Sequence, residues 1–456
     1  MTSTTHAGLP REAQDFLDAR PGLEFVEAFV VDLNGIARGK RLPASALSRV
    51  FDSGLCLPAS TLALDVWGRD VQETGLVFET GDADHPCRPV PGSLRSLPWS
   101  RRAGAQVLLQ MLTVSGEPFL ADPRNILQRV ASRFQDIDLF PVVATELEFR
   151  LFDASPGSDG APRPPAGLAR SGGSQLYGLD ELDTMEEVFA EMEQACLDQD
   201  LPADTIIAEQ SDGQYEINLR HVGDALLAAD QAVLLKRTIK AVARRHGMMA
   251  SFMAKPLGDE PGNGMHVHVS LVDSAGRNVF ADTEEAGSEL LQQALGGLTE
   301  TMVESTALFA PHANSFRRFQ PGCHVPMAPT WGYDNRTTAL RVPLARPEAT
   351  RIEHRVAGAD ANPYLVLAAV LAGIHHGLEE KLTPPPETRG DACRDHPAEL
   401  PIAWETALAS FEQSEFVADY LGKECRRLFA ACKRQEIEQM RRNVPRIEYE
   451  TYLGTI

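Results

Sequence analysis

Residues 314–355 read NSFRRFQPGCHVPMAPTWGYDNRTTALRVPLARPEATRIEHR, and their charge sets them apart from the rest of the chain. They hold seven arginines, no lysine and three acidic residues, although the whole chain has a formal net charge of −21. The guanidinium fork matches the oxygens of carboxylates and phosphates, so arginine without lysine indicates recognition of anions. Ion pairs at the surface would explain the stretch equally well, and residues upstream decide between the two. The arginines are Arg317, Arg318, Arg336, Arg341, Arg346, Arg351 and Arg355.

The composition is that of an ordinary globular protein. The chain has 456 residues, of which 43% are hydrophobic and 23% charged, and its length suggests two or three domains. The strong negative charge argues against nucleic acid as a partner. The first residues show no basic segment followed by an apolar core, so we expect no secretory signal. The most apolar run, Tyr364–Ile374, is too short to span a membrane.

The cysteines predict a reducing compartment. They are scattered, odd in number and never arranged as CxxC, which argues against a disulfide framework or a structural zinc site. We therefore expect a cytoplasmic protein. The seven are Cys56, Cys87, Cys196, Cys323, Cys393, Cys425 and Cys432.

The N-terminal part, residues 15–115, is expected to form a small mixed-sheet domain. Residues 24–42 predict a hairpin in which Asn34-Gly35 supplies the positive φ angles of a tight turn. Further strands are expected at Thr61–Trp67, Leu76–Glu79 and Gln106–Val114.

The remainder, residues 116–456, alternates helices and strands. Asp122 followed by Pro123 predicts the start of a helix, because aspartate is a good N-cap and proline fits the first helical position. A long strand is expected at Leu139–Phe152. Amphipathic helices are expected at Ala225–His246, Trp404–Phe411 and Glu415–Arg441.

Several acidic residues lie where they could meet. Glu146 and Glu148 are two apart in an apolar strand (TELEF), so both carboxylates share one face. Glu209 and Glu216 bracket a turn at Asp212-Gly213. Carboxylates that face a core need a cation or a shifted pKa, whereas a strand open to solvent would need neither.

A glycine-rich approach, GNGMHVHVS (262–270), leads into a strand with His266 and His268 on one face. In RIEHR, Glu353 stands between Arg351 and Arg355 on the same face of another strand. Five glutamates and one histidine are thus available to a metal, and this oxygen-rich set suits Mg²⁺ or Mn²⁺ better than zinc. Hard divalent ions beside several arginines indicate phosphoryl transfer from ATP.

Together these motifs resemble the glutamine synthetase family over nearly the whole chain, from DLNGIARGK to the helical C-terminus. The resemblance implies an α+β fold, with a β-grasp domain at 15–115 and a catalytic α/β domain at 116–456. It also implies stacked hexameric rings, a dodecamer, whose active sites lie between neighbouring subunits. The implied cofactors are ATP and two or three Mg²⁺ or Mn²⁺ ions.

The resemblance also implies a role for each matching residue. Glu148, Glu209 and Glu216 would hold one metal, and Glu146, His266 and Glu353 another. Arg336, Arg341 and Arg351 would bind phosphates, with His268 and Ser270 on the nucleotide side. Arg318, Arg355 and the backbone of Gly262 would bind glutamate. In the family's reaction, ATP phosphorylates the γ-carboxylate of glutamate, and an amine then displaces phosphate to give an amide.

The chain departs from ammonia-using members of the family in three places. Their Asp-Gly-Ser-Ser motif is replaced by GLCLPASTLALDVWG (54–68), the flap glutamate by His324, and an asparagine that touches the substrate by Pro261. A neutral imidazole can accept a proton from an alkylammonium but is a poor trap for ammonium. The pattern is similar to the γ-glutamylpolyamine synthetase branch.

We therefore expect an ATP-dependent ligase that joins glutamate to a primary amine. A polyamine such as putrescine or spermidine is the first choice, in polyamine catabolism. The catalytic candidates are His324, Arg336 and Glu353. A monoamine such as ethanolamine or a hydrophobic amine, an ammonia-dependent enzyme, and an inactive regulatory homologue remain alternatives.

Overall fold

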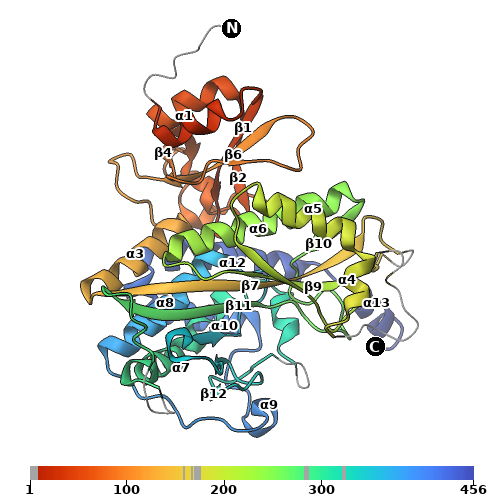
Figure 1. Cartoon of the computed structure of the whole chain (residues 1–456). Coiled ribbons are helices and arrows are strands. Elements are labelled where there is room, and N and C mark those ends of the chain that lie inside the picture. Colours follow the sequence, from red (N-terminus) through yellow and green to blue (C-terminus); the bar gives the residue numbers. More distant parts are fainter. Residues whose placement is uncertain (1–8, 158–159, 166–167, 169–175, 282–286, 321–324) are drawn as a thin grey trace.

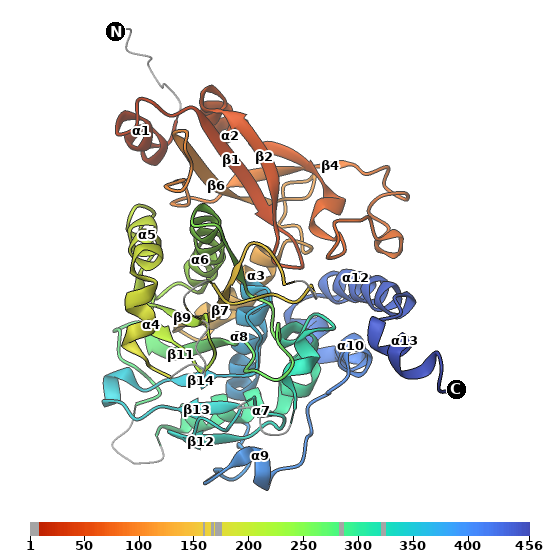
Figure 2. The same cartoon turned by 90° about the vertical axis from the view of Figure 1, so that its right-hand side faces the viewer.

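The computed structural model describes residues 9–157, 160–165, 168, 176–281, 287–320 and 325–456. Two sheets organise the described residues, and both Figure 1 and Figure 2 show them as separate layers with helices between and below them. Strands β1–β6 form the first sheet and β7–β14 form the second. The limits of the domains, 15–115 and 116–456, stay a prediction.

The first sheet has the strand order β2-β1-β6-β4-β3, with β5 paired to β6. Strand β1 is antiparallel to β2 and parallel to β6, so the sheet is mixed, as expected. The six strands are β1 Phe25–Val31, β2 Ala37–Pro43, β3 Leu55–Pro58, β4 Asp84–Pro89, β5 Arg95–Ser96 and β6 Gly104–Met111.

The hairpin between β1 and β2 is confirmed, but its turn differs from the prediction. The connection spans residues 32–36, and of the Asn34-Gly35 pair only Gly35 has a positive φ, 75°. The Asp32 side chain closes the turn by accepting hydrogen bonds from the backbone amides of Asn34 and Ile36, both at 2.9 Å. The buried carboxylate of Asp32 therefore stabilises the connection between β1 and β2, which is longer than a two-residue turn.

Two predicted strands of this region are wrong. Thr61–Trp67 includes the end of a 3₁₀ helix, Ala59–Leu62, and then a turn in which the Asp65 carboxylate accepts from the amides of Trp67 and Arg69. Leu76–Glu79 lies in turns that follow another 3₁₀ helix, Gln72–Thr74. Side-chain bonds to nearby backbone amides compete with strand pairing, and the apolar pattern does not reveal this.

The second sheet has the order β12-β13-β14-β11-β7-β9-β8, with β10 paired to β7. The long strand β7 is confirmed, and it lies beside β11 across the middle of the sheet (Figure 1). The strands are β7 Leu139–Asp153, β8 Ala203–Ala208, β9 Gln214–Leu219, β10 Met248–Ser251, β11 Met265–Asp273, β12 Trp331–Tyr333, β13 Leu340–Val342 and β14 Ile352–His354.

Helices cover the sheets, and α5 and α6 lie between the two layers in Figure 2. Asp122 caps α3 as expected, and its carboxylate accepts from the amide of Arg124 at 2.9 Å. The helices are α1 Arg11–Asp18, α2 Leu47–Ser53, α3 Pro123–Asp136, α4 Leu179–Thr184, α5 Glu186–Leu197, α6 Ala225–Arg245, α7 Glu289–Phe309, α8 Pro363–Glu379, α9 Ala392–Asp395, α10 Trp404–Gln413, α11 Glu415–Tyr420, α12 Lys423–Arg442 and α13 Arg446–Tyr452.

One predicted helix is divided. The stretch expected to be continuous from Glu415 to Arg441 forms α11 and α12, because Gly422 between them has a φ of 100°, a conformation that ends a helix. The apolar run expected to be too short for a membrane lies in α8. Among the described residues, no helix has the length and apolarity to cross a membrane.

Candidate active site

Strand β7 presents two carboxylates on one face. Leu147 and Phe149 point away from them and are fully buried, so the alternation expected from TELEF is confirmed. Glu146 and Glu148 are less deeply buried and face the neighbouring polar strands. The strand therefore anchors both acids through the packing of its opposite face.

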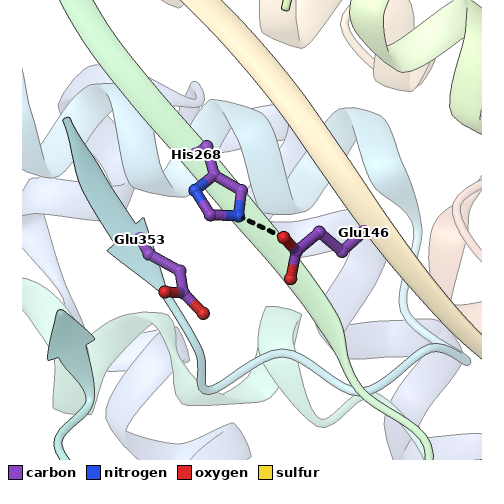
Figure 3. Close-up of side chains that lie close together, drawn as sticks. All are labelled: Glu146, His268 and Glu353. Atoms are coloured by element: carbon purple, nitrogen blue, oxygen red, sulfur yellow. Dashed lines mark ion pairs between the residues drawn. The ribbon is translucent and has the colours of Figure 1, made fainter. Parts of the chain in front are cut away.

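Strand β11 brings two histidines to these carboxylates. The register pairs His266 with Glu146, and the His266 Nδ1 atom lies 3.0 Å from the Oε2 atom of Glu146. The Nε2 atom of His268, two residues on, lies 2.8 Å from the other oxygen of Glu146 (Figure 3). One carboxylate thus contacts both imidazoles, and the two histidines share a face as predicted.

Strand β14 adds Glu353 beside His268, its partner in the register. The carboxylate of Glu353 is held by two arginines: Arg341 donates to its Oε2 atom at 2.7 Å, and Arg355 binds its other oxygen. Arg341 also bonds Asp334 at 2.6 Å. Figure 3 shows Glu353 turned toward Glu146 and His268. We call Glu353, Arg341 and Arg355 the arginine side of the site.

Strand β9 brings Glu216 opposite Glu148. The Oε2 atom of Glu216 lies 3.9 Å from the Nδ1 atom of His266. Glu209, just before β9, is close enough for its charge to act on Glu216. We call Glu148, Glu209 and Glu216 the carboxylate side of the site.

The two sides differ in electrostatics. Burial, and then repulsion from Glu146, Glu148 and Glu209, raises the pKa of Glu216 to about 10. Burial and the charge of Glu148 raise the pKa of Glu209 to about 7. Burial alone would also raise the pKa of Glu353, but Arg355 and the two histidines lower it to about 2. Hydrogen bonds from His266 and His268 likewise hold the pKa of Glu146 well below its ordinary value, against the effect of burial.

The donor atoms fit a divalent cation. Glu146, His268 and Glu353 form one triplet whose ligand atoms lie within 4.8 Å of one another, and Glu146, Glu216 and His266 form a second. Carboxylate oxygens with a minority of imidazoles suit a hard ion, which would also relieve the repulsion on the carboxylate side. The structure thus brings together His266 and four of the five expected glutamates in direct contact, while the division of ligands between ions stays a prediction.

His268 contacts both the acidic cluster and an arginine. The resemblance puts it on the nucleotide side, yet it belongs to one of the two triplets and also accepts a hydrogen bond from Arg351 at 3.2 Å. Ser270 follows on the same face of β11. The charge of Arg336 opposes, without cancelling, the rise in the pKa of Glu209. The expected phosphate-binding arginines therefore border the acidic cluster.

Arg318 and the glycines lie at the other end of the cluster. Arg318 is buried and donates to the carbonyl of Val356 at 3.0 Å. A Cβ atom at Gly262 would lie 2.8 Å from Arg318, and one at Gly264 would lie 3.5 Å from Glu148. Gly264 donates its amide to Glu148 at 2.7 Å. His324, the expected base, lies outside the described residues.

Sequence reasoning missed four residues near the site. Asp334 pairs with Arg341, and the ring of His221 lies 5.9 Å from that of His268. Arg150 and Gln214 hold the loop before Gly264. Arg150 could have been noticed, because it continues the alternation of Glu146 and Glu148. The other three carry no local signal.

Comparisons with known proteins show the family of the chain. The family model for the glutamine synthetase catalytic domain matches residues 120–452. The chain is 41% identical to gamma-glutamylputrescine synthetase PuuA of Escherichia coli (strain K12), over 97% of this chain and 94% of that protein. It is 32% identical to a glutamate–isopropylamine ligase of a Pseudomonas species, over 98% of each.

A solved structure described as a GmaS/ADP complex superimposes with a TM-score of 0.84, at 30% identity, over 96% of this chain and 98% of that one. A buried acidic and histidine cluster edged by arginines, on strands of a mixed sheet, fits the residue types that metal-assisted phosphoryl transfer requires. The chain belongs to the glutamine synthetase family. The predicted family and its α+β fold are thereby confirmed.

Proposed function

We propose that this protein is an ATP-dependent ligase that joins the γ-carboxylate of glutamate to a primary amine, with putrescine as the first candidate. The observation that carries the proposal is the 41% identity to a gamma-glutamylputrescine synthetase over 97% of the chain. The relative named for isopropylamine supports an organic amine as the nucleophile in this part of the family. The altered 54–68 segment points the same way.

The reaction has two balanced steps. The γ-carboxylate of glutamate attacks the terminal phosphorus of ATP, which gives γ-glutamyl phosphate and ADP. The amine nitrogen then attacks the acyl carbon, loses a proton and displaces phosphate. Splitting the condensation in this way replaces a poor leaving group with a good one. His324 remains the proposed base for the amine proton, from the sequence alone.

The residues of the site divide these tasks. Glu146, Glu148, Glu209, Glu216, His266 and Glu353 would hold Mg²⁺, which when bound neutralises phosphate charge. Arg336, Arg341 and Arg351 would bind phosphate oxygens. Arg318, Arg355 and the backbone of Gly262 would hold glutamate. Arg341 and Arg355 already contact Glu353, so substrate anions and this carboxylate would share the same guanidinium groups.

An assembly of stacked hexameric rings is part of the proposal, with sites shared between neighbouring subunits. Mass photometry would give the subunit number, and a monomer with full activity would exclude shared sites. A cytoplasmic location likewise remains a prediction, which rests on the pattern of cysteines.

The test is release of phosphate from ATP with Mg²⁺ and glutamate, across putrescine, spermidine, isopropylamine, ethanolamine and ammonium. Mass spectrometry of the γ-glutamyl amide identifies the product. We expect amide formation with putrescine and little with ammonium, and the variant Glu216→Gln excludes a contaminating ligase. Turnover with ammonium alone would make the protein an ammonia-dependent enzyme. Turnover with none of the amines would favour a regulatory role.

A further inference from the structure

Arg150 on strand β7 is a charged residue that is completely buried. It follows Glu146 and Glu148 on the same face of β7, and its side chain is 0% exposed. Among the described residues, Arg150 has the largest fully buried side chain. A buried guanidinium is costly unless its donors are bonded, so its partners indicate what it is for.

Those partners lie on one loop. Arg150 contacts the carboxylate of Glu260, with 2.5 Å between Nη1 and Oε2, and donates from Nη2 to the carbonyl of Pro261 at 2.8 Å. Its Nε atom has no hydrogen-bond partner among the described residues. The guanidinium fork thus fixes two consecutive residues just before Gly262. A lysine ammonium lacks the planar fork through which Arg150 binds both acceptors.

Gln214 binds the next residue of the same loop, Gly262. It is the cross-strand partner of Arg150, next to the Glu148–Glu216 pair, and its amide nitrogen donates to the carbonyl of Gly262 at 2.9 Å. The same nitrogen lies 3.2 Å from the side-chain oxygen of Asn263. Two neighbouring side chains of the sheet therefore hold the carbonyls of Pro261 and Gly262.

The far end of the loop is bound to the acidic cluster itself. Glu148 and Gly264 exchange two hydrogen bonds: the Gly264 amide donates to the carboxylate at 2.7 Å, and the Glu148 amide donates to the Gly264 carbonyl at 3.0 Å. At Gly262 the loop passes so close to its neighbours that a Cβ atom would lie 2.5 Å from the carbonyl of Ala254. The same Cβ atom would lie 2.8 Å from the side chain of Arg318. These contacts therefore fix the position of the loop relative to Glu148 and Arg318.

We propose that Arg150 is a positioning residue for the glutamate-binding loop, acting through Glu260 and Pro261 and assisted by Gln214. The inference rests on the proposed function, in which Gly262 and Arg318 hold glutamate. Proline lacks an amide hydrogen, so Pro261 can be fixed only through its carbonyl or its ring, and Arg150 uses the carbonyl. If the loop withdraws, the distance between Gly262 and the reacting carboxylate changes, while the proposed phosphate-binding residues Arg341, on β13, and Arg351, just before β14, stay in place.

The experiment compares Arg150→Met and Arg150→Lys with a matched control, Arg124→Lys. Arg124 is also an arginine held by a carboxylate, Asp230 on α6, and its side chain is only 12% exposed, but no hydrogen bond among the described residues joins it to the loop. We expect KM for glutamate to rise about 10-fold or more in Arg150→Met and less in Arg150→Lys, with KM for ATP and amine nearly unchanged. Saturating glutamate should restore most of kcat. Arg124→Lys should lower Tm without this selective effect.

Glutamate binding measured by calorimetry with Mg²⁺ and ADP separates this inference from the function. If the parent protein binds glutamate but uses no amine, the ligase proposal fails and the loop inference is still decided by the variants. Equal glutamate affinity in parent and both Arg150 variants would overturn the inference. So would a common rise in KM for glutamate and ATP that tracks the loss of Tm seen in Arg124→Lys. Should both Arg150 variants fail to fold, Glu260→Gln, at a half-exposed residue, gives the same test.

Discussion

The two sides of the acidic cluster each bury a carboxylate, but the pKa values of these carboxylates shift in opposite directions. On the arginine side, Glu353 is 1% exposed and ionised, because Arg341 and Arg355 compensate its burial. On the carboxylate side, Glu216 is nearly as buried but meets mainly other acids, and burial together with their repulsion raises its pKa to about 10. A carboxylate with fixed cations beside it stays ionised at neutral pH without a metal ion. A carboxylate without fixed cations needs a cation from solution to stay charged, so we predict that metal binding stabilises the carboxylate side more than the arginine side.

Replacing Glu353 should have the largest effect. The change Glu353→Gln removes a proposed metal ligand and leaves two guanidinium groups without their carboxylate, so turnover should fall by about 100-fold or more. Stability of the metal-free protein should also fall, by about 1 to 3 kcal/mol, because buried donors lose their acceptor. The lowered pKa means that the lost stabilisation is fully present at neutral pH and disappears only as pH falls toward 2. Phosphate release and thermal unfolding at pH 7.5 measure both, and an unchanged Tm would break the comparison.

The matched change on the carboxylate side, Glu216→Gln, should lower turnover but stabilise the metal-free protein. A raised carboxyl pKa contributes stability below the ordinary value of about 4.5 and loses it as pH rises toward 10. A neutral glutamine avoids that loss, so its advantage in Tm should grow from pH 5 to pH 8.

Mg²⁺ supplies the control for that variant. The parent should gain about 2.7 kcal/mol of stability at 100 times the dissociation constant, and Glu216→Gln should gain less at the same Mg²⁺ concentration. If Glu216→Gln destabilises the metal-free protein as much as Glu353→Gln does, the carboxylates are not repelling one another and the distinction between the two sides is wrong.

Asp122 gives the smallest effect and an internal reference. Burial raises its pKa to about 7, with Arg124 and Asp230 as its charged neighbours, and it lies at the start of α3 rather than in the cluster. Its stabilising contribution should be lost between about pH 4 and pH 7, so the stability of Asp122→Asn relative to the parent should rise over that range. Unlike the gain from Glu216→Gln, this one should not depend on Mg²⁺. Sensitivity to Mg²⁺ would show that the two carboxyls are coupled.

Local patterns were enough for the elements that carry the site. Alternation in TELEF placed Glu146 and Glu148 on one face of β7, and the same rule placed His266 and His268 on β11. The N-cap at Asp122 was read from two residues. These features depend on neighbours within a few positions, which is the range over which side-chain periodicity and capping operate.

Features that depend on distant residues could not be read in this way. The false strands at 61–67 and 76–79 are apolar enough to pair, but buried side-chain bonds, such as those of Asp65, stabilise turns instead. The roles of Arg150 and Gln214 follow from a register between β7 and β9 and from a loop more than 40 residues further along the chain. No periodicity links such positions.

The amino-acid sequence was therefore sufficient for the class of protein, because its ordered motifs resemble one family. It also supplied the residue types, five glutamates, two histidines and a run of arginines, on which the predicted ligands rest. It did not determine which carboxylates are compensated and which are crowded. That distinction arises where β14 sets Glu353 between Arg341 and Arg355 while β9 sets Glu216 opposite Glu148. Pairing of strands far apart in sequence chooses each acid's neighbours, and at these distances the neighbours set its charge.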